Sequence, residues 1–105
     1  MKFDHIGIPT KENFEDEIEL PHLKMTVSDH ENSPYGIQWQ RFWENAPYPE
    51  LVKTLPHVAF EVADLQAEIE GKTILVEPNS PIDGLTVAFI EVNGVPVELM
   101  EYDLL

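Results

Sequence analysis

The chain has 105 residues and no cysteine, and its 20 acidic residues outnumber six basic ones to give a formal net charge of −14. This composition excludes disulfides and thiolate metal sites. The negative field disfavours nucleic acid, anionic membranes and polyphosphate ligands such as coenzyme A thioesters. No apolar run approaches the ~20 residues that span a bilayer. We therefore expect one soluble, cytoplasmic domain that binds neither nucleic acid nor membrane.

The first half of the chain is predicted to contain three strands, because short runs of apolar and polar residues alternate in it. These strands cover residues 3–8, 23–27 and 37–43. The acidic stretch at 9–20 has room for a turn or a very short helix, and the segment at 28–36 is rich in turn residues. We expect a single strand in the place where the second half has two.

The second half carries a clearer β-α-β-β-β order. A strand at 55–62 precedes a short helix, for which Asp64 is a suitable N-cap and Gly71 a suitable C-terminal stop. A strand at 73–76 then leads into a loop at 78–84, where proline, asparagine, serine and glycine gather.

The hairpin near the C-terminal end is the best-defined element. Strands at 86–92 and 95–101 flank the pair Asn93-Gly94. This pair favours type I′ turns, because both residues tolerate a positive φ.

The two halves look like copies of one module. The tetrapeptide that starts at His5 aligns with the one that starts at His57, and a proline-containing linker at 45–50 separates the copies. We predict a single α+β domain of two βαβββ-type modules, at about 1–50 and about 53–105. The modules would form one curled mixed sheet, a cup, with short helices on its convex side.

Strand alternation places a set of polar side chains on the face opposite the aliphatic layer, which is the interior of a cup. The set consists of His5, Gln38, Gln40, His57, Glu61 and Glu98. Two imidazoles with a carboxylate and an amide oxygen suit a divalent metal of intermediate softness. Glu61 is either a general base beside this metal or a solvent-facing strand residue.

Other polar and aromatic residues are assigned more ordinary places. His22 and His30 lie in polar surroundings and are predicted to be on the surface. Trp39 is predicted to pack in the core, and Phe42 to line the cup.

The sequence resembles the vicinal oxygen chelate superfamily, which includes glyoxalases, bleomycin-resistance proteins and extradiol dioxygenases. The residues that carry the resemblance are those at 3–8, 56–62 and 94–100. The resemblance implies one divalent metal at the centre of the cup, with ligands from the first and last strands of each module. These ligands would be His5, Gln38 or Gln40, His57 and Glu98. Gln38 is preferred, because its strand context mirrors that of Glu98, although counting from the preceding glycine favours Gln40.

The set of two histidines, a glutamine and a glutamate looks most like that of methylmalonyl-coenzyme A epimerases. Without the glutamine it looks like that of extradiol dioxygenases and fosfomycin-resistance transferases. This chain is short for the superfamily, with an abridged first helix.

The function implied is that of an enzyme with a divalent metal, which can be zinc, nickel, cobalt, manganese or iron. The metal would chelate two neighbouring oxygens of a small-molecule substrate, in isomerase, epimerase, lyase or dioxygenase chemistry, with Glu98 or Glu61 handling the proton. The alternatives are a non-catalytic small-molecule binding protein of the bleomycin-resistance type and a structural member without metal. We also expect a homodimer, because a short chain leaves apolar surface for a two-fold partner.

Overall fold

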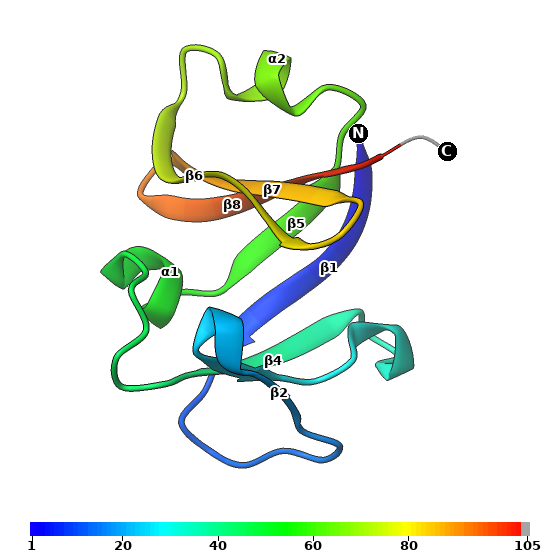
Figure 1. The fold of residues 1–105 in the computed structure, drawn as a ribbon, viewed down its shortest axis with the longest axis vertical. Coiled ribbons are helices and arrows are strands. Elements are labelled where there is room, and N and C mark those ends of the chain that lie inside the picture. Colours follow the sequence, from blue (N-terminus) through cyan, green and yellow to red (C-terminus); the bar gives the residue numbers. More distant parts are fainter. Residues whose placement is uncertain (104–105) are drawn as a thin grey trace.

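Within residues 1–103, which the computed structural model describes, eight strands form one curled mixed sheet (Figure 1). Their order across the sheet is β2-β3-β4-β1-β5-β8-β7-β6. The strands are β1 (Lys2–Pro9), β2 (Ile18–Leu20), β3 (Met25–Val27), β4 (Ile37–Phe42), β5 (His57–Glu61), β6 (Thr73–Ile82), β7 (Leu85–Val92) and β8 (Val95–Tyr102). The helical elements are α1 (Glu50–Thr54), α2 (Leu65–Ile69) and 3-10 turns at Pro21–Leu23 and His30–Asn32.

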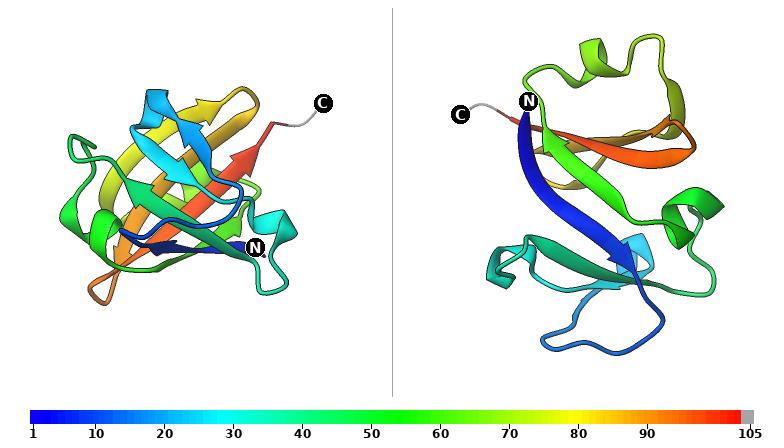
Figure 2. Two further views of the ribbon diagram at one scale, coloured as in Figure 1. Left: turned by 90° about the horizontal axis from the view of Figure 1, so that it is seen from below. Right: turned by 180° about the vertical axis from the view of Figure 1, so that it is seen from behind.

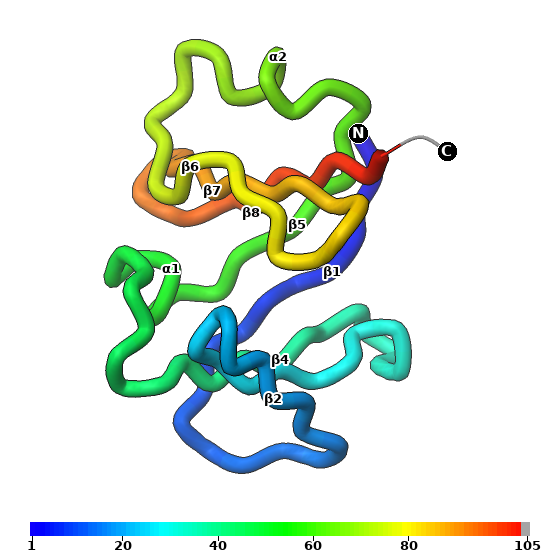
Figure 3. The backbone as a smooth tube through the Cα atoms, in the orientation of Figure 1, coloured from blue at the N-terminus to red at the C-terminus, as the bar shows by residue number. Residues whose placement is uncertain are grey.

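The sheet consists of two four-stranded halves with the same arrangement. In the first half β1 runs parallel to β4, and β3 and β2 follow as antiparallel neighbours. In the second half β5 runs parallel to β8, followed by antiparallel β7 and β6. Antiparallel pairing of β1 with β5 joins the halves, which curl toward each other from this centre (Figure 2, Figure 3). The predicted α+β fold with a curled mixed sheet is confirmed.

The helix that follows β5 begins and ends where the sequence predicts. Asp64 has extended backbone, and its side chain accepts a hydrogen bond from the Ala67 N–H at 3.2 Å. This bond satisfies one of the free N–H groups of the first turn. Gly71, two residues beyond α2, has a φ of 75°, a conformation that suits glycine.

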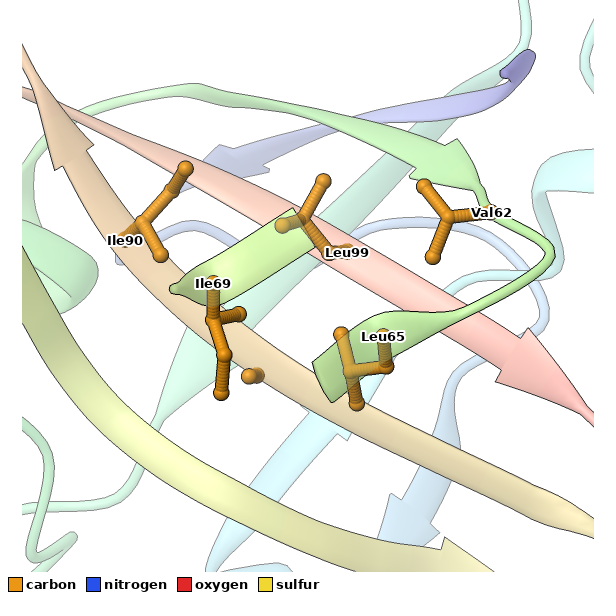
Figure 4. Packing of buried hydrophobic residues seen from close by; sticks show 6 residues of the cluster. Val62, Leu65, Ile69, Ile90 and Leu99 are labelled. Carbon is orange, nitrogen blue, oxygen red and sulfur yellow. The ribbon is translucent and has the colours of Figure 1, made fainter. Parts of the chain in front are cut away.

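The short helix α2 covers the convex face of the second half of the sheet. Leu65 and Ile69 lie four residues apart and both point toward the strands (Figure 4). They pack against Val62, Ala88, Ile90 and Leu99. Burying each large aliphatic side chain contributes roughly 1.5–3 kcal/mol, so this layer stabilises the packing of α2 on the strands beneath it.

The first half has a loop where the second has its helix, since residues 10–17 form no helix. Arg41 on β4 holds this loop. Its guanidinium donates to both carboxylate oxygens of Glu17, at 2.7 and 2.8 Å, and lies over the Phe14 ring. The convex face of the first half is therefore covered less completely than that of the second.

Trp39 shows the consequence of this missing helix. Trp39 stands opposite Ile8 in the pairing of β4 with β1, as Leu99 stands opposite Phe60 in the pairing of β8 with β5. Leu99 is 2% exposed beneath α2, whereas Trp39 is 38% exposed. The prediction that Trp39 packs in the core is wrong, because no helix covers its face.

Three elements differ from those predicted. The first half has two short strands, β2 and β3, where one was expected. Helix α1 begins at the last residue of the predicted linker at 45–50 and occupies the residues before the predicted strand at 55–62, where no element was expected. The strand β6 continues to Ile82 through an expected loop, because β6 is an edge strand with an irregular register to β7. Proline is tolerated on such an edge, where its missing N–H breaks no ladder bond.

The hairpin of β7 and β8 is confirmed, with Asn93 and Gly94 at φ values of 50° and 81°. Among residues 1–103, no helix has the length and apolar character needed to cross a membrane.

Candidate metal centre

Three buried side chains from adjacent central strands meet in the hollow of the sheet. His5 lies on β1, His57 on β5 and Glu98 on β8, and they are 3%, 2% and 9% exposed. The Nε2 atom of His57 is 3.0 Å from Oε1 of Glu98, and the Nε2 atom of His5 is 3.4 Å from the same oxygen. One nitrogen or oxygen of each side chain lies within 4.8 Å of the others.

A β-bulge near the start of β1 places Asp4 beside His5. The register of β1 against β5 shifts between Phe3 and His5, so one more residue fits on β1 than on its partner. The Asp4 carboxylate accepts a hydrogen bond from Nδ1 of His5 at 2.6 Å. This bond holds the proton on Nδ1, and the buried Nε2 of His5 has no hydrogen-bond partner.

The His57 imidazole occupies space that Gly7 leaves open. A β-carbon on residue 7 would lie 2.2 Å from Cε1 and 2.6 Å from Nε2 of His57. It would also lie 2.9 Å from Nε2 of Gln40. On its other side the imidazole meets the Phe89 ring edge-on, with the ring centres 4.9 Å apart. The position of His57 is thus set by packing from β1 and β7.

The charges of the cluster are interdependent. Burial favours the neutral form of Glu98, but the adjacent imidazoles of His5 and His57 outweigh it and lower the carboxyl pKa to about 2. Burial likewise disfavours the charged form of His5, but the carboxylates of Glu98 and Asp4 raise the pKa of its imidazole. Glu98 is therefore an anion at neutral pH, and the space beside it attracts a positive charge.

Two glutamine side chains on β4 line the same hollow. Gln40 is buried, and its Nε2 donates to Oε1 of Gln38 at 2.7 Å. The Oε1 atom of Gln40 is buried without a hydrogen-bond partner. In the register, Gln38 stands opposite Gly7 as Glu98 stands opposite Ala59. Burial thus favours the Gln40 oxygen as a ligand, and the symmetry of the two halves favours the Gln38 oxygen.

Glu61 is the predicted site residue that does not join this cluster. It is the last residue of β5, is half-buried and lies 3.7 Å from the ammonium group of Lys2. It does not line the central cavity. Its surroundings are those of a strand residue that faces solvent. They do not favour the alternative, a general base beside the metal.

Two residues of the cluster, His5 and Glu98, line a cavity of about 280 Å³ inside the curled sheet, and His57 lies outside the lining. The outer strands of both halves contribute to its lining, with Met25 and Val27 from β3 and Leu85 and Val87 from β7. Phe42 lines the cavity, as predicted.

The two ends of the sheet meet through a hydrogen bond. Nε2 of His22, in the 3-10 turn after β2, lies 3.1 Å from the carbonyl oxygen of Pro81 on β6. His22 is exposed, as predicted, yet it also lines the cavity. The cup is thus closed on one side by its own edges.

His30 is a cavity residue that the sequence did not reveal. Its ring stacks on that of His5 with centres 4.6 Å apart, and its Nε2 lies 3.5 Å from Oδ1 of Asp4. His30 sits in a turn-rich segment where no periodicity indicates direction, so it was assigned to the surface. Asp4 was missed as well, because strict alternation places it on the opposite face from His5.

Known structures share this arrangement of strands. A hypothetical protein, BH1468 from Bacillus halodurans C-125, aligns with a TM-score of 0.69 at 19% identity, over 99% of this chain and 96% of that one. Methylmalonyl-CoA epimerase from Mycobacterium tuberculosis aligns with a TM-score of 0.61 at 19% identity, over 98% of this chain and 89% of the epimerase. This chain has the vicinal oxygen chelate fold. No family model matches its sequence, and no curated protein matches it.

The donors that this vicinal oxygen chelate fold brings together fit a divalent metal ion. The Nε2 of His5 has no hydrogen-bond partner and faces the anionic Oε1 of Glu98, a contact that a proton or a cation would make favourable. A divalent ion accepts nitrogen from neutral imidazole and oxygen from carboxylate or amide. The bond from His5 to Asp4 is the outer contact that typically orients a metal-binding histidine.

Proposed function

We propose that this protein is a metal-dependent enzyme of the glyoxalase type. His5, His57 and Glu98 would bind a divalent ion, and an amide oxygen of Gln38 or Gln40 would complete the set. The observation that carries the proposal is the buried Nε2 of His5, which lacks a partner and faces the same carboxylate oxygen as His57. Zinc, nickel, cobalt, manganese and iron all accept such donors.

The bound ion would act as a Lewis acid and stabilise negative charge that develops on an oxygen of a small substrate. Such assistance suits isomerisation, epimerisation, lyase chemistry or oxygen insertion. The side chains of the cavity would bind and orient the substrate and exclude water from it, because most of the lining is apolar.

We assign the proton-handling role to Glu98 rather than to Glu61. Glu98 lines the cavity and Glu61 does not. Both imidazole contacts of Glu98 are made to Oε1, which leaves Oε2 outside them. A carboxyl with a pKa near 2 is a weak base. Glu98 would take up a proton through Oε2, the oxygen that neither imidazole contacts.

A non-catalytic small-molecule binding protein of the bleomycin-resistance type is the second candidate. It is favoured by the predominantly apolar lining of the cavity and by the placement of Glu61 outside it. The two candidates differ in turnover: the enzyme converts a chelating substrate in its metal-loaded form, whereas the binding protein returns it unchanged.

Elemental analysis tests the metal requirement. Protein purified without a metal-affinity tag should contain about one divalent ion per chain, and His57→Ala should contain none. The matched control is His22→Ala, which removes an imidazole at the far side of the cavity and should retain the metal. An ion content that is equally low in all three proteins would contradict the proposal.

The amide ligand can be assigned with two further variants. We propose Gln38 on the symmetry of the two halves, with Gln40 donating to its oxygen. Gln38→Ala should then weaken metal binding by less than His5→Ala or His57→Ala, because water can replace an amide oxygen. A greater loss in Gln40→Ala than in Gln38→Ala would assign the ligand to Gln40 instead.

A further inference from the structure

The central cavity contains no permanently charged cation. None of the six lysine and arginine side chains lines it. Lys2 lies beside Glu61, Arg41 is held by Glu17, and Lys53 lies 3.3 Å from Glu50. Among residues 1–103, the only carboxylate in the lining is that of Glu98, at the proposed metal centre. A ligand therefore meets no lysine or arginine side chain in the cavity.

The side chains that line the cavity become less polar with distance from the metal centre. The donors come from the central strands β1, β4, β5 and β8. The outer strands contribute mainly aliphatic side chains, among them Val27, Val76, Ile82 and Val87. His22 and Asn79 add polar groups there, so the lining away from the metal centre is mainly, but not wholly, apolar.

The size of the cavity limits what can enter. An apolar cavity of about 150 Å³ accepts a benzene molecule. At about 280 Å³, this cavity is nearly twice as large. The enclosed part of a ligand therefore has about ten to twelve non-hydrogen atoms, which corresponds to one ring with a short polar group.

We infer that this site takes a small molecule with an apolar ring or branched alkyl body and one pair of adjacent oxygens, with at most one negative charge, located on those oxygens. The inference rests on the proposed function, since the oxygens would bind the metal. A second carboxylate, or a phosphate, would lie desolvated among mainly aliphatic side chains without a lysine or arginine to offset its charge.

The same features separate this chain from a protein that binds coenzyme A thioesters. The several phosphate charges of coenzyme A are best accommodated where cations surround the mouth of the site. This chain has a net charge of −14, and three of its six cations lie beside carboxylates elsewhere. Its ligand is therefore unlike the substrate named for the structurally similar epimerase.

Three hydroxamates with the same chelating oxygens test the inference on the zinc-loaded protein. Acetohydroxamate has a methyl body, benzohydroxamate a phenyl body, and 4-carboxybenzohydroxamate adds a charge at the far end of the ring. By calorimetry, benzohydroxamate should bind at least tenfold more tightly than acetohydroxamate, because its ring enters the mainly apolar part of the cavity. The added carboxylate should weaken binding at least tenfold. The zinc content after dialysis confirms that no probe has removed the ion.

A charge introduced in the mainly apolar part of the cavity provides the matched control. Ile82 lines the cavity and is 57% exposed, so Ile82→Lys should fold and should improve binding of 4-carboxybenzohydroxamate at least threefold. Val92 is also exposed but lies outside the cavity, so Val92→Lys should leave that affinity unchanged.

The outcomes separate this inference from the proposed function. If the protein takes up zinc but binds the three probes equally, or prefers the carboxylated probe, the inference is wrong and the proposed function stands. If the protein takes up no divalent metal, the proposed function is wrong and the inference falls with it.

Discussion

The His57 imidazole lies directly against Gly7, so close that a β-carbon on residue 7 would stand 2.2 Å from its Cε1. This contact joins the first strand of one half to the first strand of the other. The glycine therefore serves the geometry of the site rather than the conformation of the backbone, because its φ is not in the left-handed region.

Gly7→Ala should displace His57 from Glu98. The new methyl group must push aside the imidazole or the strand, at about 1–3 kcal/mol of unfolding free energy. Metal affinity should fall at least tenfold. Chemical denaturation of the metal-free variant measures the first effect, and calorimetric titration with zinc measures the second. Unchanged affinity together with unchanged stability would show that the contact is not needed for the site.

Asp4→Ala should weaken metal binding by about 10–100-fold, the usual effect of removing an outer carboxylate that orients a metal-binding histidine. The physical reason is that His5 Nδ1 would lose its acceptor and the ring could turn or change tautomer. Asp103→Ala is the control, because it removes one exposed carboxylate away from the cavity. Equal zinc affinities in the two variants would mean that Asp4 contributes only its charge.

The stability of the metal-free protein should depend on pH through two groups of the cluster. The pKa of His5 is raised above 6.5, so its contribution is present below pH 6.5 and is lost as the pH rises through the folded value. The pKa of Glu98 is lowered from 4.5 to about 2, so its contribution is present above pH 4.5 and is lost as the pH falls toward 2. Both contributions are therefore present together between about pH 4.5 and 6.5.

Thermal unfolding measured from pH 4.5 to 8.5 checks this dependence. The parent protein is compared with His5→Ala, and a chelator is present to remove metal. The difference in Tm between parent and variant should shrink as the pH rises above 6.5. Excess zinc should reverse the trend, because an imidazole binds metal only when it is deprotonated. A difference that grows with pH in the chelator would contradict the account of His5.

The exposed face around Trp39 should mediate a homodimer. The counterpart face of the second half is covered by α2, whereas the first half leaves Ile6, Ile8, Ile37 and Trp39 without a helix. Sedimentation should give a dimer for the parent and a monomer for Trp39→Glu. Tyr35→Glu changes a more exposed aromatic residue in the turn before β4 and should remain dimeric. A parent that sediments as a monomer at micromolar concentration would rule the dimer out.

The sequence predicts those parts of the fold that depend on the alternation of apolar and polar residues along strands or on the residues preferred in turns. Asn93-Gly94 marked the last hairpin, and the period of two turned His5, His57 and Glu98 toward one face. The match between the two halves suggested that these strands would meet at the centre of one sheet.

Other parts of the fold and of the candidate site depend on features that the hydrophobic periodicity of the sequence does not show. A one-residue bulge brings Asp4 to the same side as His5, and a sequence with regular alternation gives no sign of it. His30 approaches His5 from a turn whose path is fixed only by tertiary packing. Trp39 has the pattern of a core residue, but the helix that would bury it is absent from residues 10–17.

Calorimetric titration of the protein with zinc, nickel, cobalt and manganese at pH 7.5 tests the central claim most directly. The parent should bind at least one of these ions with a stoichiometry of about one and an affinity well below millimolar. His5→Ala, His57→Ala and Glu98→Ala should each lose most of that affinity while unfolding cooperatively as the parent does. If no ion binds the parent more tightly than millimolar, or if all four proteins bind equally, His5, His57 and Glu98 do not form a metal centre.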